Sequence, residues 1–172
     1  MLIAMAGLPG TGKSTLARRL AKVLPAVVLD KDAVRAALFS PSEIEYSTPQ
    51  DDLCVDIMLQ VAGYMFGKDP HKHVILDGRS FSHRYQVEAV RAFAAKLGVE
   101  SVFIECVCSD EVVRQRLERD VALGTHPAAN RDYAMYKSVK AQAEPIPGPK
   151  LVVDTERDLD RAVARCLAYT EG

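Results

Sequence analysis

Short apolar runs alternate along this chain with longer segments in which apolar and charged positions mix. The apolar runs cover residues 2–6, 26–29, 73–76, 102–107 and 151–153. Runs of this length, bounded by polar residues, are typical of buried strands, and the segments between them have the periodicity of helices. Five strands separated by helices predict an α/β fold, in which a five-stranded parallel sheet is covered by helices on both faces.

The longest of the intervening segments has the signals of a helix start and a helix face. Pro49 fits the first turn of a helix that has Thr48 as its N-cap. The core-facing stripe of this helix is expected at four apolar positions spaced four apart, which are Leu53, Ile57, Val61 and Met65. Further helices are expected over residues 14–24, 32–39, 84–97, 131–143 and 158–169, and after Ser109.

The 172 residues fit a single domain, residues 1–172, with no internal repeat and no linker. A strongly charged helix after Ser109 leads into a turn-rich segment over residues 124–130. We expect residues of about 114–143 to form a helical lid over a binding site.

The strongest motif lies between the first predicted strand and the first predicted helix. It reads Gly-Leu-Pro-Gly-Thr-Gly-Lys-Ser-Thr and has the spacing G-x-x-x-x-G-K-[ST] of a phosphate-binding loop. Backbone N–H groups of such a loop surround a β-phosphate at a helix N-terminus. Lys13 can reach the β- and γ-phosphates, and the Ser14 hydroxyl can ligate magnesium. The predicted ATP-binding residues are Gly7, Gly10, Thr11, Gly12, Lys13, Ser14 and Thr15.

Carboxylates follow several of the other predicted strands. Ligands of open parallel sheets bind beyond the carboxyl ends of the strands, where these residues would lie. The third strand ends in Asp77, Gly78 and Arg79, which gives residues 74–77 the form of a Walker B element. An acid at that position can hold a water of the magnesium shell beside Ser14. The alternative for Asp77 is a turn or helix-capping aspartate.

The second strand ends in a pair of aspartates, Asp30 and Asp32. Their spacing lets one carboxylate anchor the loop while the other faces the site. A carboxylate near the γ-phosphate can accept a proton from an attacking hydroxyl. Arg35 follows Asp32 by three residues, so both project from one helical face. The alternative is that Asp32 only caps the helix and pairs with Arg35.

Arginines surround the turn-rich segment, at positions 114, 116, 119 and 131. Phosphoryl transfer needs cations to neutralise developing charge and a lid to exclude water. Arg116 and Arg119 are three apart on the predicted helix and can reach the same side. A solvated charged face is the alternative for each arginine alone, and for the cluster we favour a lid.

Composition limits the classes of function. A formal net charge of −1 argues against a dedicated electrostatic nucleic-acid binder. Residues 1–6 are too short for a secretory signal, and no apolar run approaches membrane-spanning length. We therefore expect a cytoplasmic protein with no membrane contact and no obligate protein partner. The four cysteines lack metal-site spacing and are expected to be reduced structural thiols.

The motifs together resemble small P-loop kinases, the group of AAA_33-like domains, zeta toxin, chloramphenicol phosphotransferase and the 5′-kinase domain of polynucleotide kinase. The resemblance extends from the N-terminus to about residue 135. It implies a P-loop NTPase fold and the cofactors ATP and Mg2+. It also implies that Asp32 is the general base, that Arg35 orients the acceptor and that Arg116 and Arg119 contact the donor phosphates. Asp30, Arg35 and Arg79 are the expected acceptor-side residues.

A weaker resemblance is to adenylylsulfate kinase. Residues 29–35 resemble its L-D-G-D-N-x-R element, and residues 149–155 resemble its final strand. Lys31 replaces the glycine of that element, and two further segments of the family pattern are missing.

The leading hypothesis is therefore an ATP-dependent kinase whose acceptor is a hydroxyl of a small molecule or a nucleic-acid end, and a toxin-like role is one form of it. The alternatives are adenylylsulfate kinase and a nucleotide-hydrolysing switch or regulatory ATPase.

Overall fold

Five parallel strands form the centre of the computed structural model, which describes residues 1–123 and 132–171. Across the sheet the strands follow the order β2 (Ala26–Asp30), β3 (His73–Asp77), β1 (Leu2–Ala6), β4 (Ser101–Val107) and β5 (Leu151–Asp154). The predicted α/β class and the five parallel strands are confirmed. Because β1 is the central strand, the loop that follows it leaves the middle of the sheet.

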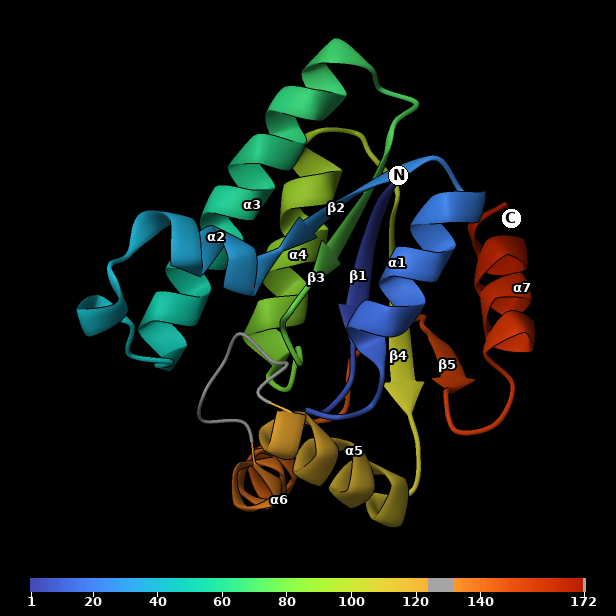
Figure 1. Cartoon of the computed structure of the whole chain (residues 1–172). Coiled ribbons are helices and arrows are strands. Elements are labelled where there is room, and N and C mark those ends of the chain that lie inside the picture. The colour runs from blue at the N-terminus through green and yellow to red at the C-terminus, as the bar shows by residue number, and fades with distance from the viewer. Residues whose placement is uncertain (124–131, 172) are drawn as a thin grey trace.

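Helices cover both faces of this sheet (Figure 1). On one face, α3 (Thr48–Lys68) and α4 (Arg84–Lys96) pack against alternate residues of β1, such as Leu2 and Ala4. On the other face, α1 (Lys13–Val23) and α7 (Leu159–Thr170) pack against Ile3 and Met5. All of β1 is buried for this reason, which explains why its sequence is apolar at every position.

The predicted start of α3 is displaced by one residue. The N-cap is Ser47, whose side chain accepts a hydrogen bond from the backbone N–H of Gln50, and Thr48 is the first helical residue. Ser and Thr are both good N-caps, and the sequence offered them side by side.

The predicted apolar stripe of α3 meets the core only in part, through Met65. Leu53 and Val61 are 47% and 39% exposed. The buried stripe is shifted around the helix by one position, to Cys54, Met58, Ala62 and Phe66. Because α3 is apolar around most of its circumference, periodicity alone does not decide which face meets the sheet.

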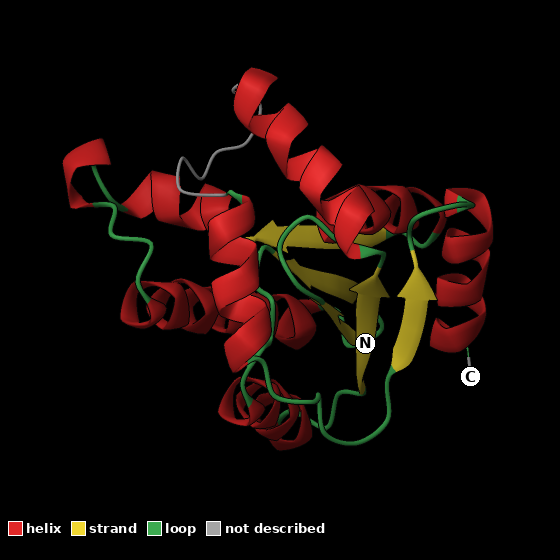
Figure 2. Cartoon of the chain, turned by 90° about the horizontal axis from the view of Figure 1, so that it is seen from below, coloured by secondary structure: helices red, strands yellow, loops and turns green. Residues whose placement is uncertain are grey.

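Further helices lie around the carboxyl ends of the strands. They are α2 (Lys31–Leu38), a 3-10 turn at Pro41–Glu43, α5 (Asp110–Leu123) and α6 (Tyr133–Gln142). Figure 2 shows the molecule of Figure 1 from below, with helices around the sheet. The last two helices pack through Val113, Leu117 and Tyr136, and form the described part of the expected lid. The turn-rich segment over residues 124–130 and Arg131 lie outside the described residues.

None of the helices in the described part of the chain combines the length and the apolar character that a membrane span requires. All four cysteines are free, as expected. Burial raises the pKa of Cys106 to about 12 and that of Cys166 to about 11, so these two thiols stay protonated and unreactive.

Candidate active site

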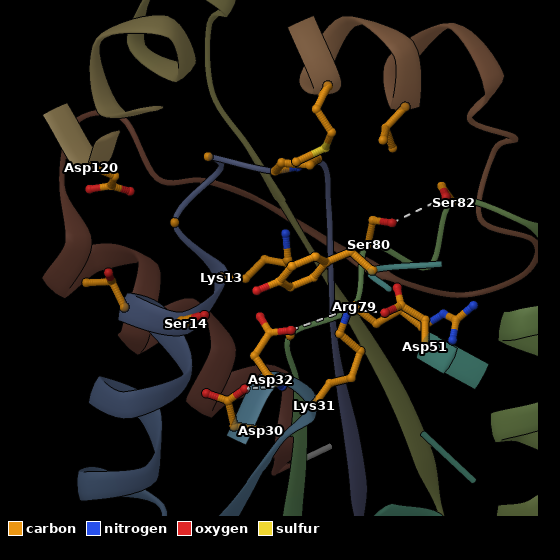
Figure 3. A pocket seen from close by; sticks show the side chains of 18 of the residues that line it. Lys13, Ser14, Asp30, Lys31, Asp32, Asp51, Arg79, Ser80, Ser82 and Asp120 are labelled. Atoms are coloured by element: carbon orange, nitrogen blue, oxygen red, sulfur yellow. Dashed lines mark hydrogen bonds and ion pairs between the residues drawn. The ribbon is translucent and has the colours of Figure 1, made fainter. Parts of the chain in front are cut away.

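A cavity of about 780 Å³ lies beyond the carboxyl ends of β1, β2 and β3. Its walls come from the glycine-rich loop, α2, the start of α3, the segment after β3, α5 and α6. Figure 3 shows Lys13 and Ser14 on one side of this cavity and Asp51, Arg79, Ser80 and Ser82 on the other, with Asp32 between them. A cavity of this size and position is that of a ligand site.

The glycine-rich loop curls around the ammonium group of Lys13. Lys13 Nζ donates hydrogen bonds to the backbone oxygens of Gly7 and Leu8, at 2.7 and 2.9 Å. Gly12 has φ of +84°, the left-handed conformation that favours glycine. At Gly7 a Cβ would lie 2.3 Å from the Cys106 carbonyl oxygen, so only glycine fits there.

Most of the predicted ATP-binding residues line the cavity. Those that do are Gly10, Gly12, Lys13, Ser14 and Thr15. Gly7 and Thr11 are instead buried within the loop and do not line the cavity. The Thr11 hydroxyl closes the loop by donating to the Leu8 carbonyl oxygen at 2.7 Å. The loop therefore presents its Lys–Ser–Thr end to the cavity and uses its first glycine for packing.

Asp77 ends β3 beneath the loop and is only 3% exposed. Burial raises the pKa of its carboxyl group, while hydrogen bonds from Ser14 and from the Gly78 backbone lower it. One carboxylate oxygen, Oδ1, is buried without a hydrogen-bond partner among the described residues. Asp77 Oδ1 lies beside the Ser14 hydroxyl, where it could accept a hydrogen bond from a water that coordinates Mg2+. The ion itself would be held mainly by phosphates and waters.

No group of three or more His, Cys, Asp or Glu side chains in the described residues could hold a metal ion by itself. A magnesium site here would therefore need the phosphates of a nucleotide to complete it, which is the usual arrangement for Mg2+ in phosphoryl-transfer proteins.

The two aspartates at the end of β2 take different positions. Asp30 caps α2 by accepting hydrogen bonds from the backbone N–H groups of Asp32 and Ala33, at 2.8 and 3.4 Å. The Asp32 side chain is free of capping and lines the cavity. One carboxylate anchors the chain and the other faces the site, as the spacing suggests, although Asp30 also borders the cavity.

Asp32 belongs to a compact network of charged side chains. The Arg35 guanidinium, 2% exposed, pairs with Asp32 at 2.5 Å and also with Asp51 of α3. Lys31 Nζ lies 2.7 Å from Asp51 and 3.6 Å from Asp32. The salt bridge considered as an alternative for Asp32 and Arg35 is thus present, and both residues line the cavity as well.

Arg79, which follows β3, is buried at the same side of the cavity. Its guanidinium pairs with Asp52 of α3 at 2.5 Å, and the Tyr85 hydroxyl donates to the same carboxylate at 3.0 Å. Arg79 thus lines the same cavity as Asp32 and Arg35.

The described arginines of the expected lid separate into two groups. Arg116 and Arg119 line the cavity. Arg116 donates to the Thr155 carbonyl oxygen at 2.8 Å and to the Thr155 hydroxyl at 3.2 Å. Arg114 instead pairs with Glu111 on the exposed side of α5, which is the solvated face considered as the alternative.

Sequence reasoning underestimated two residues of the site. From the sequence Asp51 is, with Tyr46 and Asp52, only a guess for the lining of the acceptor pocket, and nothing local marks it as the partner of Lys31 and Arg35. Thr155 follows β5, so its strand-end position was a signal. Its hydroxyl donates to the Thr11 carbonyl oxygen at 2.7 Å, which ties the glycine-rich loop to β5 and to Arg116.

Comparisons with known proteins agree with this geometry. A family model described as AAA domain matches residues 2–142. No curated protein matches the chain in sequence.

Among solved structures, a candidate kinase from Chloroflexus aurantiacus is 25% identical, with a TM-score of 0.76 over 97% of this chain and 96% of that one. An APS kinase from Mycobacterium tuberculosis, in complex with AMPPNP and APS, is 18% identical, with a TM-score of 0.73 over 99% and 97% of the two chains. A gluconokinase from Sinorhizobium meliloti is 18% identical, with a TM-score of 0.68 over 96% and 89%. The last two similarities show a shared fold, the P-loop NTPase fold.

Proposed function

The chain belongs to the family of AAA domains, and we propose that it is an ATP- and Mg2+-dependent kinase. It transfers the γ-phosphoryl group to a hydroxyl of a small molecule or of a nucleic-acid end. The observation that carries this proposal is that Asp32 faces the same cavity as Lys13 and Ser14. A phosphate loop alone supports nucleotide binding, whereas a carboxylate across the cavity from it supports transfer to an acceptor.

The donor half consists of the glycine-rich loop and the start of α1. Backbone N–H groups at a helix N-terminus bind phosphate oxygens, and Lys13 adds a positive charge toward the β- and γ-phosphates. Ser14 and Asp77 would hold Mg2+, which neutralises charge on the phosphates when it is bound. In the structure Lys13 Nζ donates to the backbone oxygens of Gly7 and Leu8, and it exchanges these bonds for phosphate oxygens when ATP binds.

Asp32 acts on the acceptor. As the acceptor oxygen forms its bond to the γ-phosphorus, the bond from that phosphorus to the β–γ bridging oxygen breaks and ADP leaves. The hydroxyl proton passes to the Asp32 carboxylate. Arg35 holds one carboxylate oxygen of Asp32 at 2.5 Å, which leaves the other oxygen for the acceptor. General-base assistance of this kind contributes about 10²- to 10⁴-fold in rate.

Arg116 and Arg119 act from the lid. Both reach the cavity from α5, on the side of the glycine-rich loop. Guanidinium groups there neutralise the charge that spreads over the transferred phosphoryl group, and a closed lid keeps water from competing with the acceptor.

A coupled ADP-release screen tests this proposal. The panel contains nucleosides, oligonucleotides, sugars, antibiotics and adenylylsulfate, and each hit is checked for a phosphorylated product. We expect at least one hydroxyl compound to raise ADP release, and the increase to be lost in Lys13→Ala and Asp32→Asn. ADP release that no acceptor stimulates, and that Asp32→Asn leaves unchanged, would instead indicate a nucleotide-hydrolysing switch.

A further inference from the structure

The cavity has two halves that differ in their charge. Near the glycine-rich loop, the cavity is lined by four cations and one carboxylate, which are Lys13, Arg18, Arg116, Arg119 and Asp120. Within the part of the chain that the structure describes, Arg18 and Arg119 form no ion pair with a carboxylate, and Arg116 bonds only to neutral groups of Gly10, Cys108 and Thr155. Arg18, Arg116 and Arg119 therefore give this half the excess of positive charge that a triphosphate requires.

In the opposite half, each buried cation already has a carboxylate partner. Lys31 is held by Asp51, and Arg35 is held by both Asp51 and Asp32. Arg79 is held by Asp52. Lys31, Arg35 and Arg79 are 7%, 2% and 5% exposed. Arg35 Nε and Arg79 Nε have no hydrogen-bond partner among the described residues, but both atoms are buried and out of a ligand's reach. The other charged groups of these three cations are paired inside the protein and are not offered to a ligand.

The flat face of the Arg35 guanidinium is occupied as well. The Tyr46 ring lies over it, with 5.2 Å between the guanidinium carbon and the ring centroid. An anion that approached Arg35 would have to displace a carboxylate from its edge or the ring from its face. It would also meet the negative charge of Asp32 and Asp51, which face the same space.

The remaining polar groups of this half are mainly hydroxyls and amides, with the imidazole of His83 beside them. Ser80, Ser82, Gln86 and Gln142 line it, and the Ser80 hydroxyl donates to the Ser82 hydroxyl at 3.2 Å. Hydroxyl and amide groups both donate and accept, and the carboxylates of Asp32 and Asp51 accept. Several acceptors beside mixed donor–acceptor groups suit a ligand that carries several hydroxyls.

We infer that the acceptor is an uncharged polyhydroxyl compound, of the class of sugars, polyols and nucleosides, and that an acceptor with a phosphate, sulfate or carboxylate group is disfavoured. This inference rests on the proposed kinase function and specifies its acceptor. An uncharged acceptor also argues against the adenylylsulfate kinase alternative, because the acceptor of that enzyme, adenylylsulfate, carries a negatively charged sulfate group.

Inorganic sulfate is the first probe, because its use does not require a known acceptor. The protein is saturated with Mg2+ and a non-hydrolysable ATP analogue, so that the donor half is filled. Sodium sulfate at low millimolar concentration is then compared with sodium chloride of equal ionic strength, and Tm is measured. For the wild type we expect the same Tm in both salts.

Asp51→Asn should create the anion site that the wild type lacks, because Lys31 loses its closest partner. Sulfate should then raise Tm by several degrees. Glu100→Gln is the matched control: it removes one negative charge at the opposite end of the sheet, before β4, and should not respond to sulfate. A sulfate response of the nucleotide-loaded wild type that Lys31→Gln abolishes would overturn the inference.

Matched acceptors provide the second measurement. Glucose is compared with gluconate and glucose 6-phosphate, and uridine with uridine 3′-monophosphate. We expect the uncharged member of a productive set to have a kcat/KM at least 10-fold higher. A preference for the anionic members would overturn the inference and leave the kinase proposal intact. If no compound is phosphorylated and the ATP analogue does not stabilise the protein, the kinase proposal fails. The sulfate response without the analogue is then compared between the wild type and Lys31→Gln, because only sulfate bound in the acceptor half should depend on Lys31, and a response that Lys31→Gln abolishes would still overturn the inference.

Discussion

The Asp32 carboxylate and the Arg35 guanidinium are joined at 2.5 Å across one turn of α2. This pair combines two requirements of a phosphoryl-transfer site. The carboxylate is held in one orientation toward the cavity, and the guanidinium that holds it is itself fixed by Asp51 of α3. Three side chains from two helices thus place the proposed base without depending on a ligand.

Arg35 should therefore be a stabilising residue as well as a positioning residue. Arg35→Met removes the buried cation and leaves Asp32 and Asp51 facing each other, so the free energy of unfolding should fall by about 3 kcal/mol. Urea denaturation measures this change. The control is Arg19→Met, which breaks the exposed pair of Arg19 with Asp160 and should cost less than about 1 kcal/mol. Equal losses in the two variants would contradict the network.

Asp77 should reduce the stability of the ligand-free protein at neutral pH. Because burial raises the pKa of its carboxyl group, the folded protein holds this proton to higher pH than the unfolded chain does. The stabilising contribution of the protonated group is present below the unfolded pKa and is lost as the pH rises through the folded pKa. In EDTA at pH 7, Asp77→Asn should be more stable than the wild type toward urea, and the gain should disappear at pH 4.

The same substitution should weaken the use of magnesium. An outer-shell ligand of a metal typically contributes about 10- to 100-fold in affinity. The Mg2+ concentration that gives half-maximal activity should rise by that factor in Asp77→Asn. A variant whose stability and Mg2+ dependence both match the wild type would remove Asp77 from the proposed site.

Thr155 should support nucleotide binding from behind the loop. Thr155→Val removes the hydroxyl that bonds the Thr11 carbonyl oxygen and receives a bond from Arg116, at about 1 kcal/mol for each hydrogen bond. We expect the KM for ATP to rise about 5- to 10-fold, with a smaller change in kcat. Thr155→Ser keeps the hydroxyl and should restore the KM, whereas a merely structural role of the side chain would leave both variants alike.

The sequence predicted those features of the fold that depend on local pattern. The apolar run of residues 2–6 is fully buried, as a central parallel strand must be, and the spacing of Asp30 and Asp32 correctly separated a cap from a cavity-facing carboxylate. Both inferences need only a few neighbouring residues. The glycine-rich loop was predictable for the same reason.

Features that depend on packing between distant elements were not predictable. The core face of α3 is decided by the sheet, and its pattern allowed Leu53 as readily as Cys54. The role of Asp51 arises because α3 places it beside Lys31 and Arg35, which come from α2. The Thr155 hydroxyl donates to the Thr11 carbonyl oxygen although 144 positions of sequence separate the two residues. This contact depends on the order of the strands in the sheet, which no local sequence pattern indicates.

The central claim is that Asp32 accepts the proton of an attacking hydroxyl while the glycine-rich loop holds ATP. Single-turnover transfer of a radiolabelled γ-phosphate, with the best acceptor of the screen, tests it most directly in the wild type, Asp32→Asn and Lys13→Ala. We predict that Asp32→Asn binds ATP with unchanged affinity and transfers phosphate about 10²- to 10⁴-fold more slowly, and that Lys13→Ala loses affinity for ATP as well. Transfer at the wild-type rate by an Asp32→Asn variant that binds ATP normally would contradict the account.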